Sequence, residues 1–240
     1  MRVPNVSRAV IGKVLLPLAA VQYVVLEAVA AAAWHDPPYN YAVNFISDLG
    51  NPVAGDVFDG RTINSPLHLV MDTAFIAQGV LFAAAAAVLL HPLYRAAGRR
   101  LGKALLVLAV LHGIGVIMVG LFPESAAALT NGVIIAHGIG AATTIITGNV
   151  IAIVVAAAGR GLAVPAWHRV LGFTLGVLGL AAFVLLQVNH SLYVSAGGVP
   201  ERIAVYTIIA WEAVTGIALL VSRTGVRPIT SATMKKESIA

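Results

Sequence analysis

Six apolar runs, each of about 18 residues or more, set the limits on what this chain can fold into. A helix of about 20 residues is long enough to cross the roughly 30 Å hydrocarbon core of a bilayer. Charged residues make up only 10% of the chain, against about 25% in a soluble domain, which argues against a soluble protein with a single core. We therefore predict an all-α, polytopic membrane bundle with six transmembrane helices, at approximately residues 12–33, 66–90, 104–122, 132–158, 170–190 and 203–222.

The basic residues gather at one end of the predicted bundle. Of the 15 lysines and arginines, only Arg61 and Arg202 fall on the opposite side. Loops rich in Lys and Arg stay in the cytoplasm, so we predict that both termini are cytoplasmic, as an even number of spans also requires. We expect a multi-pass protein of the plasma membrane, with the bundle in residues 1–222 and a polar, disordered cytoplasmic tail in residues 223–240.

The residue types exclude several kinds of site. The chain has no cysteine, so it has no disulfide, thiolate metal site or cysteine nucleophile. The net charge of +5 comes from clusters beside the spans, where membrane orientation explains it, and we expect no nucleic-acid binding. The sequence also contains no phosphate loop, dinucleotide fingerprint or serine elbow.

The longest polar stretch between two spans, residues 34–65, is predicted to form an extracytoplasmic lid loop. It carries aromatic, amide and acidic side chains in close succession, including Asn44, Ser47 and Asp48. We interpret Ser47 and Asp48 as contributions of this loop to a pocket beneath it, or as the turn that holds the loop in place.

Ionisable residues in the spans indicate where that pocket lies. Charged groups within a membrane usually face the bundle interior, because an unpartnered charge there costs several kcal/mol. At about 1.5 Å per residue, Glu27, Asp72 and His137 reach a similar depth, roughly 9–10 Å from the outer boundary, while His112 and Glu212 lie deeper. We therefore predict an outward-facing polar pocket that contains Glu27, Ser47, Asp48, His68, Asp72, His112, His137, His190, Glu201, Arg202 and Glu212.

The preferred hypothesis is that this pocket binds a lipid headgroup, a cation, or both. An alternative is a metal-dependent membrane hydrolase that acts on a lipid. It would hold zinc or another divalent cation with an open position for water, and a carboxylate would serve as general base. The candidate ligands are His68, Asp72, His137 and His190, and the candidate catalytic carboxylates are Glu27, Asp48 and Asp72.

Two further interpretations stay open. The acids Glu27, Asp72 and Glu212 could exchange protons or bind a cation in a proton- or cation-coupled small-molecule transporter. Alternatively, the polar groups could simply satisfy one another, with Arg61 or Arg202 paired to a carboxylate. The protein would then be a structural, lipid-sensing or partner-binding component whose partners are membrane lipids or another membrane protein.

Several short motifs resemble those of a membrane family catalogued as domain of unknown function 998. They are Ser47-Asp48-Leu49-Gly50 after the first span, Gly120-Leu121-Phe122-Pro123 at the end of the third, His137 in the fourth, and Glu201-Arg202 before the last. The resemblance covers nearly the whole chain. It implies a bacterial or archaeal integral membrane protein of about six spans, and it carries no settled activity.

Overall fold

The computed structural model describes residues 8–159, 162, 164–189, 191 and 195–221. Within them, six helices are long and apolar enough to cross a membrane, so the prediction of an all-α, six-span bundle is confirmed. Their bounds are α1 Arg8–Ala33, α2 His68–Ala97, α3 Arg99–Leu121, α5 Val133–Ala158, α6 Ala166–Val188 and α8 Gly198–Val221.

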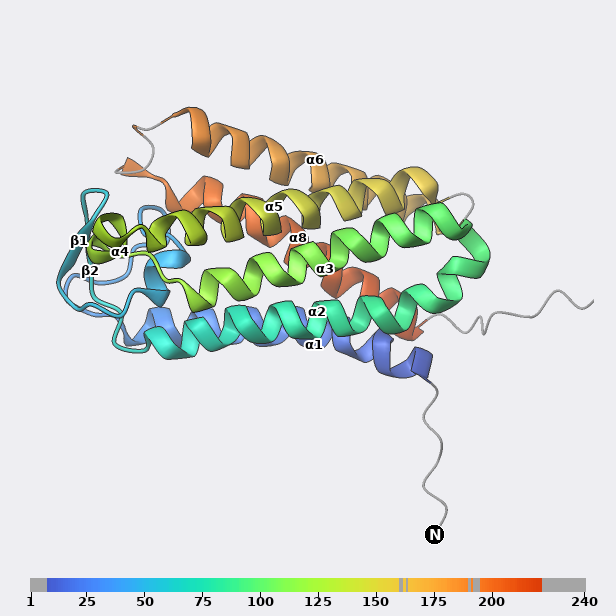
Figure 1. Cartoon of the computed structure of the whole chain (residues 1–240), viewed down its shortest axis with the longest axis horizontal. Helices are drawn as coiled ribbons and strands as arrows, with labels where there is room; N and C mark the ends of the chain where they lie inside the picture. Colours follow the sequence, from blue (N-terminus) through green and yellow to red (C-terminus); the bar gives the residue numbers. More distant parts are fainter. Residues whose placement is uncertain (1–7, 160–161, 163, 190, 192–194, 222–240) are drawn as a thin grey trace, which may run out of the picture.

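Short elements connect the long helices at one end of the bundle, which we call the hairpin end. They are the 3-10 helix η1 (Ser47–Gly50), strands β1 (Asp56–Phe58) and β2 (Arg61–Ile63), and helix α4 (Ala126–Asn131). The start of α1 and the end of α8 both lie at the opposite end (Figure 1). The cytoplasmic location of both termini stays a prediction, and the predicted tail of residues 223–240 lies outside the described residues.

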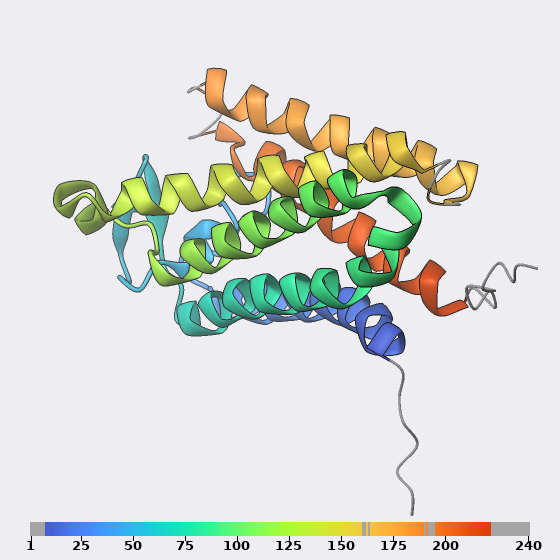
Figure 2. The ribbon, with the colours of Figure 1, turned by 45° about the vertical axis from the view of Figure 1, so that its right-hand side comes forward.

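The six long helices form a closed ring. In ring order, α1 packs on α2, α2 on α3, α3 on α5, α5 on α6, α6 on α8, and α8 returns to α1. The seam between the first and last helices is tight, because Gly216 of α8 lies directly against Pro17 of α1. The two ribbon views show this arrangement from different sides (Figures 1 and 2). A ring of this kind leaves a central space in which side chains from all six helices can meet.

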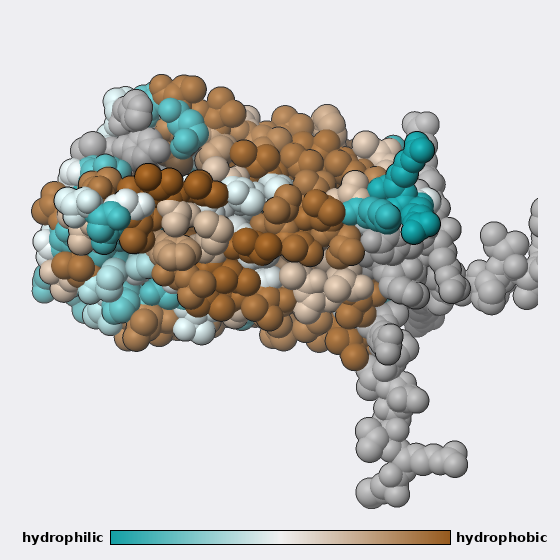
Figure 3. Space-filling model, in the orientation of Figure 1, coloured by the Kyte–Doolittle hydropathy of each residue, from teal (hydrophilic) through white to brown (hydrophobic). Residues whose placement is uncertain are grey.

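The outer surface has the polarity of a membrane protein. Large aliphatic side chains such as Val80, Ile139 and Val184 point outward and are more than half exposed. Hydrophobic residues cover the middle of the face in Figure 3, and hydrophilic residues lie toward the two ends. A helix that is apolar on its outer face is stable only in lipid or against another apolar surface, which fits the six predicted spans.

The last helix begins earlier than the sequence predicts. The predicted span starts at residue 203, with Glu201 and Arg202 ahead of it, whereas α8 starts at Gly198 and contains both residues in its first turns. Charged residues in a sequence predict the end of a span, because an isolated charge is costly in a membrane. Here both side chains are buried and have polar partners, so the helix continues through them.

Glycines allow the ring helices to approach closely. A Cβ atom built on Gly140 of α5 would lie 2.8 Å from Cβ of Met118 and 2.9 Å from the carbonyl oxygen of Gly115, both on α3. By contrast, a Cβ built on Gly138, two residues earlier, would meet no atom within 4 Å. Small residues at such crossings replace the hydrophobic effect as the source of helix association in lipid.

The two glycines therefore predict opposite effects of the same substitution. Gly140→Ala should destabilise the bundle by about 1–3 kcal/mol, because the added methyl group forces α3 and α5 apart. Gly138→Ala should stabilise it by up to about 1 kcal/mol, because alanine favours a helix over glycine. Thermal unfolding of both variants in the same detergent checks this, and equal melting temperatures would contradict the close packing of α3 on α5.

Candidate functional site

The lid loop is shaped by a tight hairpin. Asp59 and Gly60 join β1 to β2 and have positive φ angles of 48° and 76°, as a two-residue hairpin turn requires. The strand register pairs Phe58 with Arg61, so the two side chains lie on the same face of the hairpin. That face points inward, since both residues are buried. The guanidinium of Arg61 lies 5.8 Å from the ring centre of Phe58 and 4.1 Å from that of Phe45.

Asp48 in η1 holds the lid loop together. Its carboxylate accepts two hydrogen bonds from Arg61, from Nε at 2.9 Å and Nη2 at 3.0 Å, in the two-pronged geometry that makes such pairs strong. It also accepts from the backbone N–H of Phe45 at 2.8 Å and from the Asn44 side chain at 3.3 Å. Burial opposes the charge on Arg61, but the hydrogen bonds and charge of Asp48 outweigh it and raise the Arg61 pKa.

Arg202 fastens the lid loop to the ring. Its guanidinium, on α8, donates to the carbonyl oxygens of Tyr41 and Asn44, both at 2.7 Å, and also to the Tyr39 hydroxyl. The same group donates to Glu27 of α1 at 3.4 Å. The other oxygen of Glu27 accepts from the Tyr206 hydroxyl at 2.8 Å. One buried cation thus joins the loop, α1 and α8.

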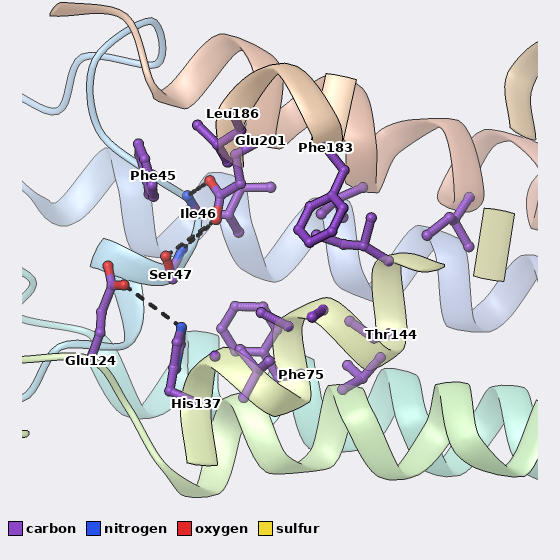
Figure 4. A pocket seen from close by; sticks show the side chains of 18 of the residues that line it. Phe45, Ile46, Ser47, Phe75, Glu124, His137, Thr144, Phe183, Leu186 and Glu201 are labelled. Atoms are coloured by element: carbon purple, nitrogen blue, oxygen red, sulfur yellow. Dashed lines mark hydrogen bonds and ion pairs between the residues drawn. The ribbon is translucent and has the colours of Figure 1, made fainter. Parts of the chain in front are cut away.

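Glu201, the neighbour of Arg202 in the sequence, binds the beginning of η1 through its carboxylate. Its carboxylate accepts from the backbone N–H of Ile46 and from the N–H and hydroxyl of Ser47, the last at 3.2 Å. These are the N–H groups at the beginning of a short helix, which lack partners within the helix and favour a negative charge. Figure 4 shows Glu201 and Ser47 in this contact.

A second buried acid, Glu124, lies between Arg61 and His137. One of its oxygens is 3.9 Å from Nη2 of Arg61, and the other is 3.7 Å from Nε2 of His137. Burial raises the pKa of Glu124 well above its ordinary value, and the nearby Asp48 carboxylate raises it further, although Arg61 acts in the opposite direction. Nδ1 of His137 is 2.8 Å from the carbonyl oxygen of Phe122, so it carries the proton. In the neutral ring, Nε2 therefore faces Glu124 with a lone pair.

These groups surround one end of a cavity of about 310 Å³ inside the ring. At the hairpin end its walls carry Ser47, Glu124, His137 and Glu201, and Figure 4 shows Glu124 and Glu201 on either side of Ser47. Most of the remaining wall is apolar. The deeper polar groups that line it are Gln78, His112 and Thr144.

Some of the predicted pocket residues line this cavity and others do not. Ser47, His112, His137 and Glu201 line it. Glu27, Asp48 and Arg202 lie in the hydrogen-bonded network that holds the lid loop, and Glu212 lies behind His112 at 3.8 Å. His68 and Asp72 pair with each other at 3.6 Å away from the cavity wall. His190 lies outside the part of the chain that the structure describes.

The helical rise predicts one depth for Glu27, Asp72 and His137, but of these three only His137 lines the cavity. Each has a different partner: Arg202 for Glu27, His68 for Asp72, and Glu124 for His137. By contrast, the expectation that Arg61 or Arg202 pairs with a carboxylate is confirmed for both arginines.

The proposed zinc site receives no support from this arrangement. The histidines lie in separate His–carboxylate pairs, and within the described ranges no three His, Asp or Glu side chains are placed to hold one metal ion. Because His190 is not described, the ligand set His68, Asp72, His137 and His190 stays a prediction.

Glu124 and Gln78 line the cavity but were not among the predicted site residues. Glu124 follows Pro123 just beyond a span, where a sequence pattern indicates an exposed loop acid. Gln78 lies within a span and carries no charge, so a search for ionisable residues passes over it. A search for any polar residue in an apolar span finds Gln78, and the excess of acids over bases in the outer loops is the available signal for Glu124.

The role of Arg202 gives a test by hydrogen exchange. Arg202→Lys keeps the charge beside Glu27 but loses the planar fork that binds the carbonyl oxygens of Tyr41 and Asn44. We expect faster amide exchange in residues 39–48, with little change in α2 and α3. Arg99→Lys, at an exposed arginine, is the control and should leave that segment unchanged. Unchanged exchange in Arg202→Lys would show that other contacts hold the loop.

Comparison with known proteins identifies the family and no activity. No curated protein and no solved structure matches the chain. A family model with the description "Protein of unknown function (DUF998)" matches residues 17–218, which include all six spans in large part, the lid loop and the cavity. The match confirms the resemblance noted in the short motifs. The chain therefore belongs to the membrane-protein family described as Protein of unknown function (DUF998).

Proposed function

We propose that the protein binds an amphiphile with a positively charged amine head group in its central cavity. The head group lies between Glu124 and Glu201 at the hairpin end, and the hydrocarbon tail follows the apolar wall. The observation that carries this proposal is the distribution of polarity along one cavity inside a ring of membrane spans.

Like one leaflet of a bilayer, the cavity is polar at its outer end and apolar below. Its polar end, at Ser47 and Glu124, lies where the long helices give way to loops, which is the depth of lipid head groups. Below it, the wall consists largely of aliphatic and aromatic side chains such as Phe75, Val119 and Phe183. Pockets with a mostly apolar lining and a few convergent polar groups are the usual form of small-molecule sites.

The charges at the polar end favour a cation. Three carboxyl groups, those of Asp48, Glu124 and Glu201, act on one another at this end, and Arg61 lies beside the first two with Asp48 as its bidentate partner. Arg202 acts on both Glu201 and Glu27, so the wider network holds four carboxyl groups against two guanidinium groups. An ammonium group beside Glu124 would supply positive charge and an N–H donor for its buried Oε1, which lies 3.9 Å from Arg61 and accepts no hydrogen bond from the described residues.

The tail has a route to the surrounding lipid. Gly138 of α5 lines the cavity and is also exposed on the outer surface, so only bare backbone separates the two at this point. Across from it on α6, Gln187 likewise lines the cavity and is exposed. These residues mark an opening between α5 and α6 through which an alkyl chain can enter sideways from the membrane.

Photolabelling tests the site. The probe is a long-chain primary alkylamine with a diazirine in its tail, added to the protein in lipid nanodiscs. We expect mass spectrometry to find the label on residues 134–145 of α5 and 183–187 of α6. Glu124→Gln should reduce labelling about tenfold, because a charge-assisted hydrogen bond contributes roughly 1.5–3 kcal/mol.

Two controls separate this effect from a general change of charge or fold. Asp36→Asn removes one acid from an exposed position of the lid loop, at the same end of the bundle, and should leave labelling unchanged. A probe with the same tail and a hydroxyl head should label the wild type weakly and show no loss in Glu124→Gln. Equal amine labelling of the wild type and Glu124→Gln would overturn the proposal.

The raised pKa of Glu124 predicts that binding depends on pH. A bound ammonium favours the carboxylate form, so Glu124 releases its proton on binding. The affinity should therefore rise with pH above the ordinary value of 4.5 and level off once the pH exceeds the raised pKa. Titrating the labelling between about pH 5 and 8, where an alkylamine stays protonated, checks this. The residual labelling of Glu124→Gln should vary less with pH, and an equal slope in both proteins would contradict the assignment to Glu124.

A further inference from the structure

A second pair of polar groups lies at the deep end of the same cavity. His112 of α3 and Glu212 of α8 are 2% and 0% exposed, in the middle of their membrane spans. Nε2 of His112 lies 3.8 Å from Oε1 of Glu212, and neither atom has a hydrogen-bond partner among the residues described. Two unpartnered polar atoms that face each other inside a membrane are costly unless something is bound between them.

The neighbouring hydrogen bonds indicate what would satisfy Nε2 of His112 and Oε1 of Glu212. Nδ1 of His112 lies 2.9 Å from the carbonyl oxygen and 3.0 Å from the hydroxyl of Thr144. The carbonyl oxygen can only accept, so Nδ1 carries a proton. In the neutral ring, Nε2 then has a lone pair. The other oxygen of Glu212 accepts from Gln78 at 2.7 Å, so Oε1 also presents lone pairs. A single proton satisfies both atoms, either as a carboxylic acid that donates to imidazole or as an imidazolium that donates to carboxylate.

We propose that His112 and Glu212 form a proton-binding dyad that holds one shared proton and exchanges it with the hairpin end through the cavity. A small movement of either side chain brings the 3.8 Å separation within hydrogen-bonding distance. The proton comes from water in the cavity and returns to it, with no other bond made or broken. This proposal does not depend on whether an amphiphile binds.

The cavity provides the route from one side only. His112 and Gln78 line its wall, so the dyad lies at its floor. Toward the opposite end, the ring is filled by the apolar cluster Leu16, Phe82, Ala85, Leu105, Ala109, Ile151, Ala152 and Trp211. The Phe82 ring packs on His112 with ring centres 4.5 Å apart. Tightly packed apolar side chains exclude water, so proton exchange toward that end is blocked.

Other titratable groups on the packed helices are engaged elsewhere. Glu27 of α1 is bound by Arg202 and Tyr206, and His168 of α6 is 2.9 Å from the Thr215 hydroxyl. Tyr23 of α1 is buried and lines the cavity. On α2 the group that faces Glu212 is the amide of Gln78, which does not titrate. The shared proton is therefore assigned to His112 and Glu212.

Infrared spectroscopy at pH 7 tests whether the proton is present. The comparison is between wild type and Glu212→Gln, which keeps the shape of the side chain and an oxygen for Gln78. We expect the variant to lose the C=O band of one protonated carboxyl group. If the proton lies on His112 instead, the variant loses carboxylate bands, and ¹⁵N NMR of His112 in the wild type shows both ring nitrogens protonated. A carboxylate at Glu212 together with a neutral His112 would overturn the proposal, and so would a carboxylic acid together with an imidazolium.

Hydrogen–deuterium exchange of the same infrared band tests the route. Ala141→Phe places a ring in the cavity between the two ends and should slow the exchange about tenfold in D₂O, because the path is filled. Ala181→Phe, the same change at an exposed site on α6, should exchange at the wild-type rate. Equal rates in both variants would overturn the cavity as the route. Photolabelling by the amine probe reports separately on the amphiphile, so the two proposals can fail independently.

Discussion

The arrangement of the hairpin end depends on the burial of two arginines. Arg61 and Arg202 are each less than one-tenth exposed, and a buried guanidinium without a partner is strongly destabilising. The two solve this problem differently. Arg61 pairs with Asp48 inside the lid loop, so it folds the loop upon itself. Arg202 lies on α8 and reaches both Glu27 and the loop carbonyls, so it fixes the folded loop on the ring. The walls of the cavity at this end follow from these two pairings.

The buried acids divide into two groups by the completeness of their contacts. Asp48 and Glu27 have strong donors on both oxygens, and their contacts explain their presence without a ligand. Glu124 and Glu212 each have a buried oxygen that accepts no hydrogen bond from the described residues. Each carboxyl group also lies beside a histidine whose other nitrogen is close to a carbonyl oxygen. Both proposals therefore rest on the second group, whose free oxygens can accept a hydrogen bond from a cation or a shared proton.

The sequence predicts the spans well because a long apolar run has few alternatives. It also indicates, as one interpretation, that Arg61 or Arg202 pairs with a carboxylate, but it does not identify Asp48 and Glu27 as the partners. It fails for the shared pocket of Glu27, Asp72 and His137, because helical rise gives the depth of a residue but not the direction in which it points. That direction depends on how the ring helices pack, at contacts such as Gly115 on Gly140. The hairpin was missed although Asp59-Gly60 is a strong turn signal. Residues 56–58 and 61–63 are too short for their alternation to stand out.

The closed ring also constrains the order in which the protein assembles. Helices enter the membrane in the order of synthesis, so α1 is in place long before α8 is made. Until then the seam at Pro17 and Gly216 is open, and Glu27 has no cation beside it. The partner of the one acid in the first span thus arrives with the last span. A chain that stops before α8 leaves Glu27 without Arg202 and a ring with one side missing. In this fold, the salt bridge between Glu27 and Arg202 can form only after the last helix has been made.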